Sequence, residues 1–165
     1  MSEAQRLVDL IPRLRRYARA LVGDRASADD LVQDTLERAW AKLHLYRRGT
    51  DLRAWLFTVM HNVHVNKVRS ARATDPLEDE MPELAQRAAQ GDALVVRDLD
   101  RAIARLPAEQ RTVLLLVALE EMSYDQVARA LGIPIGTVMS RLSRAREKLR
   151  TMMLGQAAAK LKVVK

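Results

Sequence analysis

The chain has 165 residues, a formal net charge of +7 and no cysteine. Apolar residues make up 48% of it, which is enough for a packed core in one domain or in two small ones. The absence of cysteine excludes disulfides and thiolate metal sites. No apolar run approaches the ~20 residues of a membrane span, and no secretory signal is recognisable at the start, so we expect a cytoplasmic protein that makes no membrane contact itself.

The charge is unevenly distributed along the chain. Residues 75–100 contain eight acidic side chains and two arginines, although the whole chain is basic. A basic chain favours a polyanionic partner such as nucleic acid. Alanine, leucine, arginine and valine recur at helical spacings while aromatic residues amount to 4%, so we expect an all-α protein with two small helical domains joined by an acidic linker.

The first helix with a clear partner face is predicted at residues 27–43. Ser27 followed by Asp30 is typical of a helix start. The apolar stripe expected to face a core consists of Val32, Leu36, Ala39 and Leu43. The opposite face is polar and mainly acidic, with Asp30, Gln33, Asp34 and Glu37. This face is either simply solvated or a docking surface for a basic protein helix, and DNA is not its expected partner.

A loop is predicted at residues 43–51 and a long helix at residues 52–73. Four of the six aromatic residues lie around this loop, among many cations: Trp40, Tyr46, Trp55 and Phe57. Aromatic rings beside cations suit single-stranded DNA, because an unstacked base needs a π surface and its backbone needs counter-charge. We expect Trp40 and Trp55 to be core residues, which leaves Tyr46 as the free ring.

The long helix carries polar side chains of two kinds. His61 and His64 are three residues apart, and His44 precedes them. Because no carboxylate or thiol shares their face at ligand spacing, we expect no metal site. The remaining polar residues suit a nucleic-acid contact surface: Asn62, Asn66, Lys67 and Arg69.

Residues 123–150 predict two helices around a tight turn. Ser123 and Gln126 form a capping box, and Gly132 and Pro134 suit the end of one helix and the start of the next. The buried stripe of the second helix is Val138, Leu142, Ala145 and Leu149. Its outer face carries Gly136, Thr137, Ser140, Ser143 and Arg144, with Arg141 and Arg146 on the flanks. Small side chains allow approach to base edges and guanidinium groups donate to guanine or phosphate, although a solvated basic helix is the alternative.

Three segments in this order resemble the extracytoplasmic-function group of the bacterial sigma-70 family. They read ADDLVQDTLERAW, TDLRAWLFTVMHNVHVNKVR and LPAEQRTVLLLVALEEMSYDQVARALGIPIGTVMSRLSRAREKL, with the acidic spacer between the last two. The resemblance implies a transcription initiation subunit with region 2 at residues 1–72, an acidic linker at 73–92 and region 4 at 93–155. Residues 156–165 lie beyond the family pattern and are expected to be a frayed basic tail.

The resemblance also implies partners and roles for the polar faces. The residues that would dock on the clamp helices of the polymerase β′ subunit are Asp30, Gln33, Asp34 and Glu37. Those that would capture and follow the −10 strand are His44, Tyr46, Arg47, Arg48, Asp51, Asn62, Asn66, Lys67, Arg69 and Arg72. Those that would read the −35 element are Thr137, Ser140, Arg141, Ser143, Arg144 and Arg146. The β flap of core RNA polymerase, promoter DNA and an anti-sigma factor complete the implied partners, with no cofactor. Met139 departs from the family, where arginine or lysine is common.

Two other functions stay open. One is a stand-alone helix-turn-helix regulator, which would need a dimer interface but neither the acidic face nor the aromatic loop. The other is a sigma mimic that sequesters an anti-sigma factor. An enzyme is not expected, because the sequence contains no phosphate loop, nucleophile elbow or paired carboxylates in an apolar setting.

Overall fold

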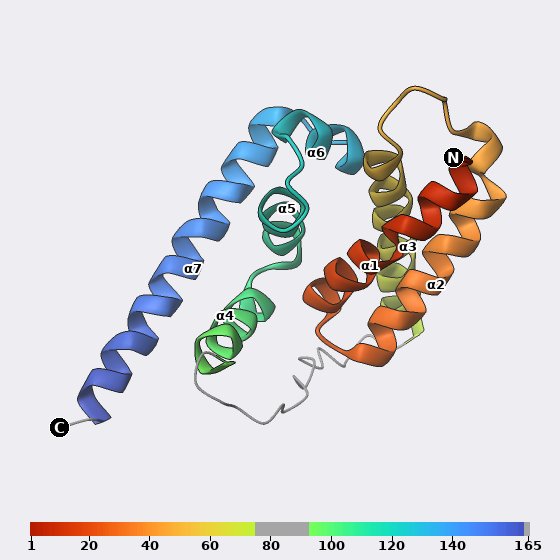
Figure 1. Cartoon of the computed structure of the whole chain (residues 1–165). Helices are drawn as coiled ribbons and strands as arrows, with labels where there is room; N and C mark the ends of the chain where they lie inside the picture. Colours follow the sequence, from red (N-terminus) through yellow and green to blue (C-terminus); the bar gives the residue numbers. More distant parts are fainter. Residues whose placement is uncertain (75–92, 164–165) are drawn as a thin grey trace.

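The computed structural model describes residues 1–74 and 93–163, and all regular structure in these ranges is helical (Figure 1). The N-terminal half contains α1 (Glu3–Val22), α2 (Arg25–Ala41), the short 3-10 helix η1 (Leu43–Leu45) and α3 (Leu52–Thr74). The C-terminal half contains α4 (Ala93–Arg105), α5 (Ala108–Ala118), α6 (Tyr124–Leu131) and α7 (Ile135–Val163). The all-α prediction is confirmed. The predicted linker at residues 73–92 lies outside the described residues from residue 75 onward.

Asp24 determines where α2 begins. The carboxylate of Asp24 accepts hydrogen bonds from the backbone N–H of Ser27 at 2.9 Å and from the Ser27 hydroxyl at 2.7 Å. These two bonds lower the pKa of Asp24. The predicted helix start at Ser27 is therefore wrong, because Ser27 lies in the first turn and donates to the capping residue. Gly23 caps the end of α1 with a φ of 75°, so only Gly23 and Asp24 separate α1 from the helix start at Arg25.

The apolar stripe predicted for residues 27–43 faces the core. Val32 and Ala39 are buried, and Leu36 and Leu43 pack against the same cluster. α1 and α3 complete this half, and Tyr17 of α1 meets Phe57 of α3 edge to face, with ring centroids 5.1 Å apart. The prediction for this stripe is confirmed.

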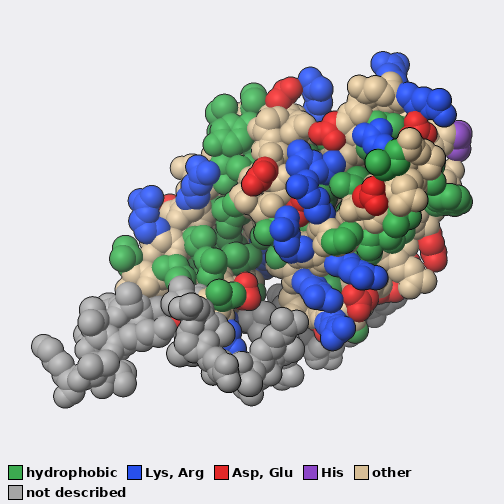
Figure 2. All heavy atoms as spheres, in the orientation of Figure 1, with side chains coloured by type: hydrophobic (Ala, Val, Ile, Leu, Met, Phe, Trp, Pro, Cys, Tyr) green, Lys and Arg blue, Asp and Glu red, His purple; other side chains and the backbone are tan. Residues whose placement is uncertain are grey.

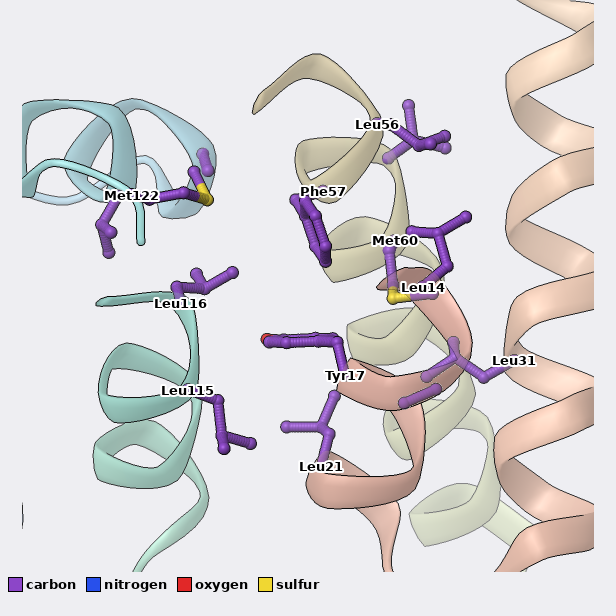
Figure 3. Close-up of a cluster of buried hydrophobic side chains, with 14 of the residues drawn as sticks. Leu14, Tyr17, Leu21, Leu31, Leu56, Phe57, Met60, Leu115, Leu116 and Met122 are labelled. Atoms are coloured by element: carbon purple, nitrogen blue, oxygen red, sulfur yellow. The ribbon is translucent and has the colours of Figure 1, made fainter. Parts of the chain in front are cut away.

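The two halves share one apolar core. Leu115 and Leu116 of α5 point toward Tyr17 and Leu21 of α1 (Figure 3). Met122, which follows α5, belongs to the same cluster and lies across from Phe57 of α3. The predicted domains are therefore in close contact in the structure, with α1 and α3 against α4, α5 and α6.

α7 is longer than predicted. Its backbone is helical to Val163, so the expectation of a frayed tail is wrong for residues 156–163, and residues 164–165 lie outside the described residues. At 1.5 Å per residue, 29 residues correspond to a rod of about 43 Å, which extends past the rest of the C-terminal half in Figure 1. In the described part of the chain, no helix has the length and apolar character to cross a membrane.

Candidate nucleic-acid and protein interfaces

The helix-turn-helix is built from α6 and α7 as the sequence predicts. Ser123 caps α6, with its hydroxyl accepting from the backbone N–H of Gln126 at 3.1 Å, while the Gln126 side chain accepts from the Ser123 N–H at 2.9 Å. Gly132 ends α6 with a φ of 67°. The predicted capping box and turn are confirmed, and the left-handed conformation of Gly132 ends α6 just before α7 begins at Ile135.

Most of the predicted −35 reading residues lie on the exposed face of α7. Ser140, Ser143, Arg144 and Arg146 are exposed and Thr137 is half-buried. Val138, Leu142 and Ala145 are buried on the other side, as predicted. Arg141 differs from the rest, because its guanidinium lies 3.6 Å from the Glu109 carboxylate of α5 and is half-buried. Arg141 is thus held against α5 in this structure.

The predicted docking face lies on the outer side of α2 and is partly neutralised. Asp30, Gln33 and Glu37 are exposed and Asp34 is half-buried. The ammonium group of Lys67, from α3, lies 2.6 Å from the Asp30 carboxylate and also pairs with Asp34. The hydrogen bonds to Asp30 and Asp34 raise the pKa of Lys67. Lys67 was predicted to follow the DNA strand, and in this structure it is bonded to two predicted docking residues.

The aromatic residues near the loop lie differently from the prediction. Trp40, expected in the core, is 64% exposed, and Tyr46, expected to be the free ring, is 6% exposed. The Tyr46 hydroxyl donates to the Thr50 carbonyl, and the centroid of the Tyr46 ring lies 5.6 Å from the centroid of the Trp55 ring. Both predictions are wrong: η1 comes just after α2 and brings Tyr46 back onto α3, whereas Trp40 lies on the outer side of α2. Trp55 packs against the core, as predicted.

The exposure of Trp40 had a signal in the sequence. It lies three residues after Glu37 and seven after Gln33, which places it on the same helix face as the polar docking residues.

The other predicted −10 residues are exposed on the loop and α3. They are His44, Arg47, Arg48, Asp51, Asn62, Asn66, Arg69 and Arg72. Arg48 pairs with Glu3 at 2.9 Å. One oxygen of Asp51 accepts from the backbone N–H groups of Arg53 at 3.0 Å and Ala54 at 3.3 Å. Asp51 therefore has a structural role as well, since it caps the start of α3.

Sequence reasoning missed the polar contacts between the two halves. The second oxygen of Asp51 accepts from the Gln126 side chain at 2.8 Å, which joins the loop to α6. Arg16 of α1 donates to the Glu120 carboxylate at 3.4 Å, and Arg53 of α3 donates to the Glu120 carbonyl at 2.9 Å. These partners are far apart in the chain, so no local spacing predicts them.

Glu120 is the least expected of these residues. It is 1% exposed, and one of its carboxylate oxygens has no hydrogen-bond partner. Burial raises the pKa of Glu120, against the opposing effect of Arg16 and two other arginines. In the sequence it is the first of two consecutive glutamates, a pair that is typical of a surface. The next residue, Glu121, has a φ of 55°, and this turn directs the chain so that Glu120 enters the interface.

In Figure 2, Lys and Arg side chains form an interrupted band down the middle of the molecule, with hydrophobic and acidic side chains around it. The band overlies α1 and its junction with the C-terminal half, as comparison with Figure 1 shows. Five arginines of α1 are exposed: Arg6, Arg13, Arg15, Arg16 and Arg19. The positive charge of the chain is therefore also concentrated where its two halves meet.

Comparisons with known proteins agree with this division into halves. Residues 7–61 match the family model described as "Sigma2 domain of PhyR", and residues 97–149 match the model described as "Sigma-70, region 4". The ECF RNA polymerase sigma factor EcfG of Rhodopseudomonas palustris is 36% identical over 145 residues, which is 87% of this chain and 80% of EcfG. The ECF sigma factor SigM of Mycobacterium tuberculosis is 35% identical over 142 residues, which is 85% of this chain and 71% of SigM.

Solved structures are similar over both halves together. The sigma factor RpoE from Bartonella quintana, in complex with the anti-sigma factor NepR, has a TM-score of 0.80 and 36% identity over 90% of this chain and 94% of RpoE. PhyRSL from Sphingomonas sp. Fr1, also in complex with NepR, has a TM-score of 0.66 and 28% identity over 92% of this chain and 88% of that chain. A score of 0.80 over nine-tenths of a two-part chain requires the parts to be similarly placed.

Proposed function

This chain belongs to the extracytoplasmic-function family of RNA polymerase sigma factors, and on that premise we propose how it divides promoter recognition between its halves. Residues 1–72 form region 2, which docks on core polymerase and opens the −10 element. Residues 93–155 form region 4, which reads the −35 element, and residues 73–92 link them. The observation that carries this proposal is the presence of an acidic α2 face and a basic, exposed recognition helix in one chain.

The polymerase contact is assigned to the α2 face with Asp30, Gln33, Asp34 and Glu37. DNA phosphates repel the carboxylates of this α2 face. A basic protein helix therefore suits the face better than a nucleic acid does. A basic partner helix, such as a clamp helix of the β′ subunit, would replace the Lys67 ammonium group at Asp30 and Asp34. The carboxylates of Asp30 and Asp34 would then be neutralised by cations of the partner helix instead of by Lys67.

Lys67 links docking to the −10 strand. While the Lys67 ammonium group is bonded to Asp30 and Asp34, it cannot pair with a phosphate. Docking of the polymerase would release Lys67 toward the single DNA strand that runs along Asn66 and Arg69. We therefore expect Lys67→Met to increase the affinity for core polymerase and to weaken binding of single-stranded −10 DNA. Arg69→Met, on the same helix, would weaken only the DNA contact.

The −10 contact is assigned to the loop and the exposed side of α3. The side chains that remain available are His44, Arg47, Arg48, Asn62, Asn66, Arg69 and Arg72. Because Tyr46 is buried, a flipped base would lie against the loop backbone and its cations rather than stack on that ring. Asp51 and Tyr46 give the loop its shape.

The remaining partners follow from the relatives. RpoE from Bartonella quintana was solved with the anti-sigma factor NepR. We propose that an anti-sigma factor holds this chain in the closed arrangement, in which the two halves pack on one another as they do in this structure. The protein would act in the cytoplasm, where bacterial RNA polymerase works, and it would contribute binding energy to initiation with no catalytic step or cofactor of its own.

Run-off transcription with purified core polymerase tests the proposal. The template is fragmented genomic DNA, and the variants are Asp30→Arg with Asp34→Arg, and Asp9→Arg as a control that reverses an exposed acid on α1. Discrete transcripts with the wild type and the control, absent with the double variant, support docking through α2. Circular dichroism melting establishes that the double variant is folded. Transcripts that persist in the double variant would contradict the docking assignment.

One observation favours a second candidate. The family model that matches residues 7–61 is that of the sigma2 domain of PhyR, and a sigma mimic would use the same fold to sequester an anti-sigma factor. The exposed cations of α7 favour a sigma factor, because a mimic has no DNA to read. Binding of the wild type to core polymerase in gel filtration separates the two, since a mimic would not bind it.

A further inference from the structure

The recognition helix α7 begins with an apolar edge. Ile135 is 44% exposed and Met139 is 48% exposed. They are four residues apart and therefore lie on one side of the helix, one turn above the other. Neither belongs to the apolar core, whose α7 members include Val138 and Leu142.

Polar and basic groups border this edge. At about 100° per residue, Arg146 and Ser143 lie on the same side as Ile135 and Met139, and Gly136, Glu147 and Ser140 follow around the helix. Arg144, Arg146 and Lys148 are exposed along the helix. An apolar edge between hydroxyls and cations suits a partner that is anionic overall but has small apolar groups on the surface it presents.

Gly136 indicates that this partner approaches closely. A Cβ built on Gly136 meets nothing within 4 Å, and its φ lies outside the left-handed range. Neither packing nor backbone conformation therefore requires glycine here, and glycine destabilises a helix relative to alanine. The missing side chain lowers the surface directly beside Ile135, where the end of a recognition helix approaches the floor of the major groove.

We propose that Ile135 and Met139 contact thymine methyl groups in the duplex promoter element read by α7, so that thymine is selected at one or two positions there. The C5-methyl of thymine is the apolar group that base pairs present in the major groove. A methionine cannot donate to guanine or phosphate as an arginine or lysine would, but it packs well on a methyl group. The proposal rests on the proposed function of region 4 and adds a specificity to it.

Replacing thymine by deoxyuridine removes only this methyl group and keeps every hydrogen bond of the base pair. Removal of one buried methyl from such a contact weakens binding about fourfold. The holoenzyme is assembled from core polymerase and the full chain, and a promoter found by run-off transcription carries deoxyuridine at each thymine of the −35 element in turn. The readout is the polymerase concentration that gives half-maximal transcript.

The variants are Ile135→Ala and Met139→Ala, with Leu154→Ala as the matched control. Leu154 is an exposed apolar residue of the same helix, 64% exposed and far from its start. We expect one or two deoxyuridine positions to require about fourfold more wild-type or Leu154→Ala holoenzyme. Each of these positions should lose its effect in the alanine variant, Ile135→Ala or Met139→Ala, that has removed the contact with that methyl group.

Three results would overturn the proposal. They are a wild type that is insensitive to deoxyuridine at every position, an alanine variant at residue 135 or 139 that keeps the full sensitivity, and a −35 element without thymine. In all three the holoenzyme still transcribes, so the proposed function stands. A wild type that yields no transcript would overturn the proposed function and this contact with it.

Discussion

Arg111 provides a direct test of how the two halves are joined. Its guanidinium donates to four backbone carbonyls: Ile103 at 3.1 Å, Ala104 at 2.7 Å, Leu106 at 2.8 Å and Leu21 at 3.1 Å. Ile103 and Ala104 lie at the end of α4, where carbonyls have no partner within the helix. Leu21 belongs to α1, so one side chain of α5 joins the C-terminal end of α4 to the other half of the protein.

The expected cost of losing these bonds follows from their number and exposure. A hydrogen bond from a charged donor contributes about 1.5–3 kcal/mol, but four bonds from one group are not additive. Arg111 is half-buried, so water reaches some of the carbonyls once the side chain is removed. We expect Arg111→Met, which keeps the length of the side chain, to lower the free energy of unfolding by about 3 kcal/mol.

Urea denaturation followed by circular dichroism measures this loss. Arg105→Met is the control, because Arg105 is an exposed cation in the last turn of α4. Its removal should cost below about 1 kcal/mol, the value of a cation at a helix end. If Arg111→Met costs no more than Arg105→Met, the four bonds do not stabilise the fold and the reasoning is refuted.

Three further predictions concern single elements. Ser123→Ala removes the cap of α6 and should cost about 1 kcal/mol in the same urea assay, and an unchanged midpoint would contradict the capping role. Burial lowers the pKa of His61 and of His64 from the ordinary histidine value of 6.5, with His61 and then Arg111 adding to the effect at His64. The folded state therefore binds protons less readily than the unfolded state. The contribution of these histidines to stability should be complete above about pH 6.5 and should fall as the pH is lowered below that value. Substitution of both histidines by Gln should flatten this decline in melting temperature. Acrylamide should quench the fluorescence of a Trp55→Phe variant, which retains exposed Trp40, several-fold more than that of Trp40→Phe, and equal quenching would contradict the placement of Trp40.

Local chemistry explains what the sequence predicted correctly. The capping box of Ser123 and Gln126 involves residues three apart, and the buried stripe of α7 repeats at three and four residues, so both are visible in a short window. The helix-turn-helix and the acidic α2 face could therefore be predicted without the rest of the fold. The helix start at Ser27 was predicted wrongly because Asp24, three residues earlier, is also of a type that caps helices. Which of the two side chains accepts the capping hydrogen bond depends on where the backbone becomes helical.

Tertiary geometry explains what the sequence could not predict. Tyr46 is buried because α2 ends at Ala41 and η1 reverses the chain. The contact of Arg16 with Glu120 joins positions 104 residues apart and has no periodicity in the sequence. The pairing of Lys67 with Asp30 similarly joins two faces that were predicted to serve different partners.

The closed arrangement cannot read both promoter elements at once. Asp51 of the loop and Gln126 of α6 are in contact at 2.8 Å, whereas elements centred near −10 and −35 lie about 25 base pairs apart, or about 85 Å along the duplex at 3.4 Å per base pair. Since we propose that one half reads each element, we expect the halves to separate when the holoenzyme engages a promoter, with loss of the contacts of Glu120 and Arg111 with the N-terminal half.

Energy transfer between the halves measures this separation. Because the chain contains no cysteine, Asp9→Cys on α1 and Asp125→Cys on α6 would accept a dye pair without competing sites, and both positions are exposed. We expect efficient transfer in the free protein and a loss of transfer on addition of core polymerase. Arg16→Met with Arg53→Met removes two of the contacts to residue 120 and should lower transfer before polymerase is added, whereas Arg15→Met, an exposed arginine of α1, should not. Transfer that persists in the promoter complex would contradict the opening of the two halves, and with it the assignment of −10 and −35 reading to separate domains of one molecule.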